Sequence, residues 1–204
     1  MSGAKVSMKT QRLVVSALMI GLGTALSLVS IGLPFGGSVT LGSMAPLVVV
    51  SQLYGFEWGA VCCTVYGILQ LVLGLDNFSY ATTIWAVLAI LVFDYIAAYG
   101  AMSLSALTRR MKSATAGAAL GSVIGCAARF VCHFITGVVV WSQWASADAL
   151  PGFVQGTGMA AGKWLIYSYS FFYNLGYMLP ETVITAVAAA AVMGVLKATK
   201  EVQK

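Results

Sequence analysis

Hydrophobic positions form long, nearly uninterrupted stretches along this 204-residue chain. A helix needs about 20 mostly apolar residues to cross the hydrocarbon core of a bilayer. Stretches of this kind predict six membrane helices, at residues 12–32, 42–55, 58–75, 81–107, 114–141 and 164–196. The second stretch is short, so five helices is the alternative count. The glycine-rich segment GLPFGGSVTLGSMAP before it suggests a loop that dips back toward a binding cavity.

Composition supports a membrane protein. The chain is 60% hydrophobic and 8% charged, whereas about a quarter of the residues of a soluble domain are charged. The first apolar stretch follows basic residues but has no clear cleavage site, and further spans follow it, so we expect a retained helix and not a signal peptide. We therefore predict an all-α integral membrane protein in which residues 1–204 form a single transmembrane domain.

The basic residues gather at the ends of the predicted helices. They precede the first helix, join the fourth to the fifth, and follow the sixth: Lys5, Lys9, Arg12; Arg109, Arg110, Lys112; Lys197, Lys200, Lys204. Six spans put all three groups on one side, and cytoplasmic loops carry an excess of Lys and Arg. Both termini are therefore predicted to be cytoplasmic. Nucleic-acid binding is not expected, because the basic residues are dispersed and no reading module accompanies them.

Four ionisable residues lie inside the predicted spans: Asp94, Arg129, His133 and Glu181. Such residues cost about 2.5–3.5 kcal/mol each at the centre of a membrane helix on insertion scales. One interpretation is structural, with an ion pair between Asp94 and Arg129, Glu181 near an interface and His133 hydrogen-bonded within the bundle. The other is a polar cavity for a ligand.

Spacing helps to distinguish these interpretations. Four residues recur at i, i+4 on the fifth helix and so share one face: Arg129, His133, Gly137 and Trp141. On the sixth helix Asn174, Tyr177 and Glu181 recur at helical spacing, around an expected distortion at Pro180. Aromatic residues at the outer helix ends fit an interface belt. Combined with these polar groups, they also suit a site for a flat, polar ligand, including a cationic one.

Four segments carry a resemblance to a known family, namely HFITGVVVWSQW, YSYSFFYNLGYMLPE, GGSVTLGSMAPLVV and FDYIAAY. In their order along the chain, which is GGSVTLGSMAPLVV, FDYIAAY, HFITGVVVWSQW and YSYSFFYNLGYMLPE, they resemble the thiamine-specific substrate-binding subunits (S-components) of energy-coupling factor transporters over nearly the whole chain. The resemblance implies a six-helix bundle in the bacterial plasma membrane that binds thiamine from outside, without catalysis, metal or cofactor. It also implies a transmembrane coupling protein and two cytoplasmic ATPases as partners, in agreement with the absence of a Walker motif here.

The resemblance also implies the ligand-binding residues. They are Asp94, Tyr95, Arg129, His133, Trp141, Tyr169 and Asn174. Arg129 is expected to order the site through Asp94 or a backbone carbonyl. Because Tyr169 and Asn174 are five positions apart, a regular helix would not align them, so an irregular start of the last helix is expected.

The chain departs from the family pattern in two places. In the loop before the second helix the family has an acidic residue and a tryptophan, where this chain has Leu41 and Gly37. Asp94 stands where glutamate is usual. These differences leave another vitamin, or a thiamine precursor, as an alternative ligand. A membrane enzyme built on Asp94, His133 and Glu181 is a further hypothesis, although no recognisable nucleophile–base pair or zinc motif supports it.

The first helix carries a ridge of small residues, Ala17, Gly21 and Ala25. Small residues four apart allow another helix to approach closely. The ridge is interpreted either as packing inside the bundle or, as the resemblance implies, as the docking surface for the coupling protein.

Overall fold

The structure is a computed structural model and describes residues 7–33 and 37–202. Within these ranges five helical segments are long and apolar enough to cross a membrane. They are α1 (Met8–Ser27), α3 (Phe56–Leu73), the continuous segment Ile84–Thr108, α6 (Ala114–Val139) and α7 (Gly162–Val202). The remaining helix of the bundle is α2 (Ala45–Tyr54), which has 10 residues. The all-α six-helix bundle is thus confirmed, with one short member.

The short helix α2 lies inside the bundle. At 1.5 Å per residue it spans about 15 Å, roughly half of the hydrocarbon core. The residues from Ala45 to Gln52 are all buried. Gln52 Nε2 donates to Ser105 O (2.5 Å) and to Thr108 Oγ1 (2.8 Å), so the polar group of α2 is satisfied by the neighbouring helix. Surrounded in this way, α2 does not need to reach both membrane surfaces.

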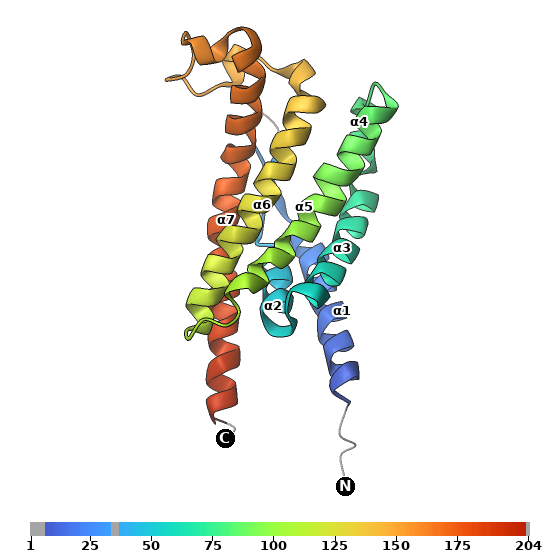
Figure 1. Cartoon of the computed structure of the whole chain (residues 1–204), viewed down its shortest axis with the longest axis vertical. Helices are drawn as coiled ribbons and strands as arrows, with labels where there is room; N and C mark the ends of the chain where they lie inside the picture. Colours follow the sequence, from blue (N-terminus) through green and yellow to red (C-terminus); the bar gives the residue numbers. More distant parts are fainter. Residues whose placement is uncertain (1–6, 34–36, 203–204) are drawn as a thin grey trace.

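The two chain ends lie at one end of the bundle (Figure 1). The connection between η3 and α6, which carries Arg109, Arg110 and Lys112, lies toward that same end, and so do the first turns of α1 and the last turns of α7. The long connection between α6 and α7 lies at the opposite end. It contains three short 3-10 turns, η4 (Trp141–Trp144), η5 (Ala147–Ala149) and η6 (Gly158–Ala160). Lys5 and Lys204 lie outside the described residues.

The fourth membrane segment changes its helical type along its length. It consists of α4 (Ile84–Ala89), a π-helical stretch η2 (Ile90–Ile96), α5 (Ala97–Gly100) and a 3-10 stretch η3 (Ala101–Thr108). The loop before it contains the 3-10 turn η1 (Leu75–Tyr80). π-helical turns within helices are frequent at functional sites. Asp94 and Tyr95 both lie in η2, so the irregular stretch of the bundle coincides with two of the predicted site residues.

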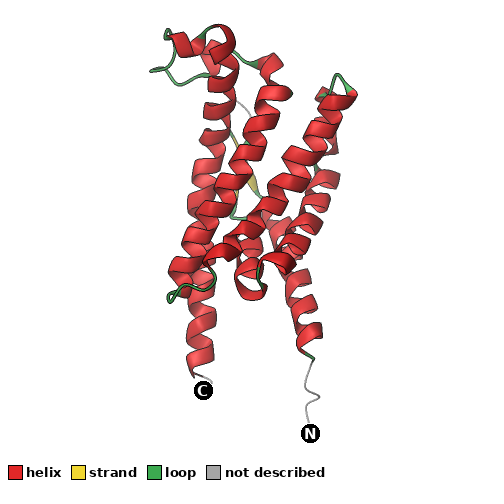
Figure 2. Cartoon of the chain, viewed as in Figure 1, coloured by secondary structure: helices red, strands yellow, loops and turns green. Residues whose placement is uncertain are grey.

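Between α1 and α2 the chain forms a short antiparallel hairpin. Its strands are β1 (Ser30–Gly32) and β2 (Ser38–Thr40), with Ser30 paired to Thr40 and Gly32 to Ser38. Figure 2 shows the hairpin in yellow behind α6, within the height of the bundle and not beyond it. The glycine-rich loop predicted at residues 32–46 thus contributes to this hairpin, and its residues 34–36 lie outside the described part of the chain.

The outer surface of the bundle is apolar. Large hydrophobic side chains are exposed on several helices, among them Leu18, Leu22, Val72, Trp85, Val187 and Val195. The ridge Ala17, Gly21 and Ala25 is exposed as well, and a Cβ built on Gly21 would have no atom within 4 Å. The interpretation that this ridge packs inside the bundle is therefore wrong, because it faces outward.

Helix α7 continues through Pro180 without interruption. The expected distortion at Pro180 and the expected irregular start near Tyr169 are absent from the described part of this helix. A proline inside a membrane helix frees one backbone carbonyl, which neighbouring groups in the bundle are able to satisfy. Tyr169 and Asn174 therefore lie five positions apart on a regular helix.

Candidate functional site

A cavity of about 610 Å³ lies between the helices and the hairpin. Its lining includes all seven residues predicted to bind a ligand: Asp94, Tyr95, Arg129, His133, Trp141, Tyr169 and Asn174. The structure thus brings together residues from η2, α6, η4 and α7. Their contact with a ligand remains a prediction.

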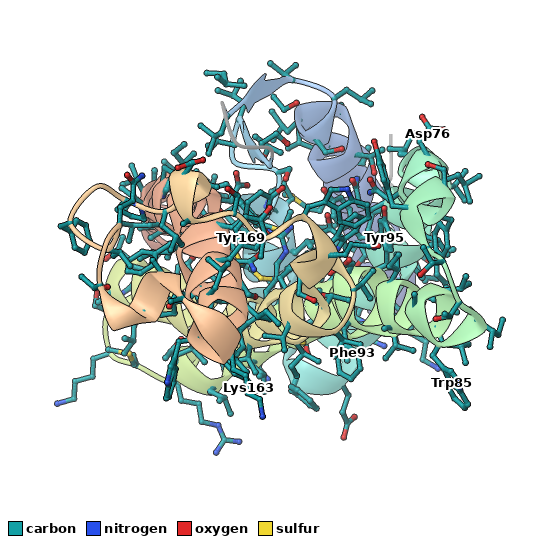
Figure 3. All side chains as sticks on the ribbon, turned by 90° about the horizontal axis from the view of Figure 1, so that it is seen from above. Asp76, Trp85, Phe93, Tyr95, Lys163 and Tyr169 are labelled. Carbon is teal, nitrogen blue, oxygen red and sulfur yellow. The ribbon has the colours of Figure 1, made fainter. Side chains whose placement is uncertain are left out.

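Figure 3 looks along the bundle from the end opposite the termini. Tyr95 and Tyr169 lie toward the middle of this view, on opposite sides of it, and both line the cavity. Trp85 and Lys163 point to the periphery. The polar and aromatic residues of the site therefore face inward, whereas the neighbouring outward positions face lipid or water.

Asp94 contacts three side chains of α6 and η4. Its carboxylate accepts hydrogen bonds from Trp141 Nε1 (3.1 Å) and from Thr136 Oγ1, and His133 Nδ1 lies 3.1 Å from Oδ1. Helix α6 ends at Val139, and the 3-10 turn that follows lets the indole of Trp141 turn toward Asp94. With His133 Nδ1 directed at Asp94, His133 Nε2 has no hydrogen-bond partner in the described structure. The carboxylate of Asp94 thereby orients the rings of His133 and Trp141 at the cavity.

Arg129 does not pair with Asp94. No ion pair joins the two among the described residues, so the structural interpretation of their charges is wrong. The guanidinium of Arg129 is instead 4.9 Å from the ring centroid of Tyr99, and its Nε has no hydrogen-bond partner there. Helix α6 runs antiparallel to the fourth membrane segment. Asp94 contacts Thr136 at one level of this pair, and Arg129 contacts Tyr99 at another level, which is nearer the end of the bundle where the chain termini lie. The two charges are therefore at different depths.

Glu181 was expected near an interface if its role was structural, but it is 3% exposed and lines the cavity. Together with Asp94 it gives the lining two carboxylates, against the single guanidinium of Arg129 among the described lining residues. Counted formally, with His133 neutral, the described lining residues carry a charge of −1. Such a charge favours a cationic ligand.

Asn174 joins α7 to α6. Its Nδ2 donates to Ser170 O (2.7 Å) and to His133 O (3.3 Å), and its Oδ1 accepts from Tyr177 Oη (2.6 Å). Tyr169 lies more than one turn nearer the outer end and packs against Tyr173, with ring centroids 5.6 Å apart. A long side chain at Tyr169 and a short one at Asn174 reach the same wide cavity from a regular helix. This is why no irregularity is needed.

Sequence reasoning missed several polar residues of the cavity wall. Asn77 Nδ2 donates to Tyr95 Oη (2.8 Å), and Gln70 Nε2 donates to Ser27 Oγ (2.9 Å). Gln70 had a detectable signal, because it is an amide within an otherwise apolar helix. Asn77 and Tyr80 lie in the loop turn η1, where no periodicity indicates which side chain faces inward.

The two positions that depart from the family pattern lie differently. Gly37 lines the cavity with φ +73°, and a Cβ there would lie 2.7 Å from Cδ1 of Tyr177. Leu41 is 62% exposed and does not line the cavity. A large aromatic side chain at Gly37 would have to displace Tyr177, so this hairpin follows a path that leaves no room for it.

The sequence of this chain is similar to those of known transporters. A family model described as thiamine transporter protein (Thia_YuaJ) matches residues 13–201. The chain belongs to this family. It is 28% identical over 189 residues to the thiamine transporter ThiT of Bacillus subtilis (strain 168), covering 86% of each chain. A solved structure of ThiT from Listeria monocytogenes has the same fold, with a TM-score of 0.68 at 20% identity over 93% of this chain and 96% of that one.

Membership of a thiamine transporter family has two consequences. The protein is a membrane transporter subunit of the S-component type, as the sequence motifs predicted. It is not an enzyme, so the hypothesis of intramembrane catalysis by Asp94, His133 and Glu181 is excluded. The chemistry of the cavity is therefore interpreted as ligand binding.

Proposed function

We propose that this protein is the thiamine-binding subunit of an energy-coupling factor importer, which captures the vitamin outside and delivers it with an ATP-driven coupling module. The observation that carries the proposal is the cavity itself. It combines a buried carboxylate, aromatic rings and one net negative charge in a chain of the thiamine transporter family. Thiamine is a cation with two flat rings, an aminopyrimidine and a thiazolium, and suits such a lining.

Each site residue has a role in this proposal. Asp94 balances the charge of the thiazolium, and its Oδ2, which accepts from Trp141, keeps capacity for a further donor. The ring of Trp141 provides a face for a cation, and His133 provides a second ring. Tyr169 and Asn174 contribute polar groups on the α7 side of the cavity.

The proposed orientation puts both termini in the cytoplasm of a bacterium. The basic residues of α1, of the connection before α6 and of the last turns of α7 gather at one end of the bundle (Figure 1), as cytoplasmic segments do. The aromatic and polar residues Tyr80, Trp141 and Tyr169 lie toward the other end. In this orientation the cavity receives its ligand from outside the plasma membrane.

A related ligand is the second candidate. The observation in its favour is the hairpin, where Gly37 replaces a larger side chain at the cavity wall and Leu41 points away from it. A different vitamin or a thiamine precursor would exploit the altered wall. Both candidates require the same Asp94 centre, so ligand titration separates them.

Tryptophan fluorescence tests the ligand directly. We expect saturable quenching by micromolar thiamine, and none by riboflavin or biotin after correction for their absorbance. Trp141→Phe should remove most of the quenching and weaken binding about tenfold, because the indole lines the cavity and donates to Asp94. The matched control is Trp85→Phe, an outward-facing residue with 75% exposure. Quenching that survives Trp141→Phe unchanged, or is absent from the parent, would contradict the proposal.

The proposed partners are a transmembrane coupling protein and two cytoplasmic ATPases. The outward ridge Ala17, Gly21 and Ala25 provides a close-packing surface for the coupling protein. We expect Gly21→Leu to leave thiamine affinity unchanged while reducing co-purification of the coupling module, and thiamine uptake by cells, at least tenfold. Val187→Leu, at another outward position with 66% exposure, is the control. Full uptake by Gly21→Leu would exclude this surface.

A further inference from the structure

A second, smaller cavity adjoins the first. Its volume is about 240 Å³, and its five described lining residues are all aromatic: Tyr80, Trp141, Trp144, Tyr169 and Tyr173. Four of them also line the larger cavity, and Trp144 is the exception. The two spaces therefore share a wall of rings. The smaller one, which we call the outer pocket, has no charged side chain among its described lining residues.

Three rings of the outer pocket hold one another in place. Tyr80 belongs to η1, whereas Trp141 and Trp144 belong to η4, and both turns lie at the end of the bundle opposite the termini (Figure 1). The ring centroid of Tyr80 lies 5.8 Å from that of Trp141 and 5.6 Å from that of Trp144, edge to face in both pairs. The two indoles are 5.7 Å apart. Because edge-to-face packing stabilises aromatic pairs, this cluster joins two separate connections of the chain.

The outer pocket is accessible from outside the bundle. Tyr80 is 51% exposed and Trp144 is 45% exposed. Aromatic rings at a membrane interface are exposed as well, and Trp164, which is 66% exposed and lines neither cavity, fits that role. The rings of the outer pocket differ, because side chains from η1, η4 and α7 converge around one space. Anchoring in lipid does not require such convergence.

A row of rings leads from the outer pocket toward the middle of the larger cavity. Tyr169, Tyr173 and Tyr177 are four residues apart on α7 and so share one face of it. Their neighbouring ring centroids are 5.6 Å and 5.9 Å apart. The ring of His133 follows Tyr177 at 6.2 Å, and its Nδ1 lies 3.1 Å from Asp94 Oδ1. Aromatic rings thus connect the outer pocket to the carboxylate of Asp94.

We propose that the outer pocket is a separate binding site for aromatic and quaternary cations, at which the ligand is held before it enters the larger cavity. The faces of aromatic rings attract cations, and tryptophan does so most strongly. A pocket without a charged group holds a cation weakly, so the ligand passes on to Asp94, whose negative charge adds to the attraction. The part in thiamine capture rests on the proposed function. The binding of a cation by the outer pocket does not, so the two are measured separately.

The first experiment measures cation binding without thiamine. The full chain, with fluorine-labelled tryptophan, is titrated in lipid nanodiscs with phenyltrimethylammonium and followed by fluorine NMR. We expect the resonance of Trp144, identified by its loss in Trp144→Phe, to shift saturably at millimolar concentrations. The shift should persist in Asp94→Asn, because that residue does not line the outer pocket. The resonance of Trp164 should not move.

Two results of this titration would overturn the proposal. One is a Trp144 resonance that stays in place, or that moves without saturation together with that of Trp164, as general contact with the cation would produce. The other is a shift that disappears in Asp94→Asn, which would put the cation in the larger cavity alone.

The second experiment measures thiamine capture by stopped-flow fluorescence. Binding in two steps makes the observed rate rise hyperbolically with thiamine concentration. Trp144→Leu should raise the half-saturating concentration by about fivefold or more, while the limiting rate and the dissociation rate stay within about twofold of the parent. Trp144→Phe keeps a ring and should have a smaller effect. Trp164→Leu, at an exposed position outside both cavities, is the matched control and should behave like the parent.

The dissociation rate distinguishes capture from contact with the bound ligand. Faster dissociation in Trp144→Leu at an unchanged half-saturating concentration would show that Trp144 acts on the bound state, and it would overturn the role in capture. An observed rate that stays linear in thiamine concentration would overturn it too. A parent protein that binds no thiamine would contradict the proposed function, and the fluorine titration alone would then decide whether the outer pocket binds cations.

Discussion

Asp94→Asn is expected to weaken thiamine binding at least 100-fold. The substitution keeps the shape of the side chain and removes the net negative charge of the cavity. In the parent, three groups face the carboxylate as donors, and they belong to His133, Thr136 and Trp141. In the variant, the NH2 of the new amide points at one of these donors and cannot accept from it. The donor left without an acceptor costs about 1–3 kcal/mol of stability, in the free protein as well as in the complex. The affinity falls because a bound cation loses its counter-charge, and a 100-fold loss corresponds to about 2.7 kcal/mol of binding free energy.

The dissociation constant, from fluorescence or calorimetric titration, measures this effect. Asp76→Asn is the matched control, because Asp76 is exposed in η1 and points to the periphery in Figure 3. It should bind thiamine like the parent. If Asp94→Asn bound thiamine within threefold of the parent, the carboxylate would have no part in recognition.

Gly137→Ala is expected to lower the melting temperature by several degrees and to distort the cavity. A Cβ at Gly137 would lie 2.0 Å from Oγ and 2.8 Å from Cβ of Ser170 on the facing helix. Ser170 is 1% exposed, and its Oγ donates to Phe134 O (2.8 Å), so it has little freedom to move. Overpacking of this kind costs about 1–3 kcal/mol, and loss of the hydrogen bond costs about 1 kcal/mol more.

Thermal unfolding in detergent, followed by size-exclusion chromatography, measures this change. Gly21→Ala is the control, since a Cβ at that glycine meets nothing within 4 Å. The double variant Gly137→Ala/Ser170→Gly should recover part of the lost stability, because it removes the atoms that the new methyl group meets. An unchanged melting temperature for Gly137→Ala would show that α6 and α7 separate there without cost.

The helices and the stripe on α6 were predictable because they depend on local properties. Bilayer thickness determines the length of an apolar stretch, so each predicted stretch overlaps an observed helix, the short α2 included. An offset is clear at α1, which was predicted at 12–32 and spans Met8–Ser27. Helical periodicity determines which residues of one helix share a face, so Arg129, His133 and Gly137 were correctly placed together. The family motifs then supplied the other predicted site residues, and all of them line the same cavity.

The partners of the buried charges were not predictable in this way. Asp94 bonds to residues 42 and 47 positions away, and Glu181 to one 141 positions away. These pairings depend on the rotation of each helix and on its axial offset against its neighbours, which no pattern within one helix records. For this reason the ion pair expected between Asp94 and Arg129 was wrong.

The sequence by itself therefore determined that this protein is a membrane bundle of the thiamine transporter type and which residues are polar within its spans, because apolar length, periodicity and motifs are properties of local sequence. The tertiary structure alone decided which of those polar residues meet. It placed Asp94 against His133 and Trp141, and it placed Glu181 against the hairpin. The physical reason is that packing sets the relative depth of the helices, and depth determines whether two charges touch or remain a turn apart.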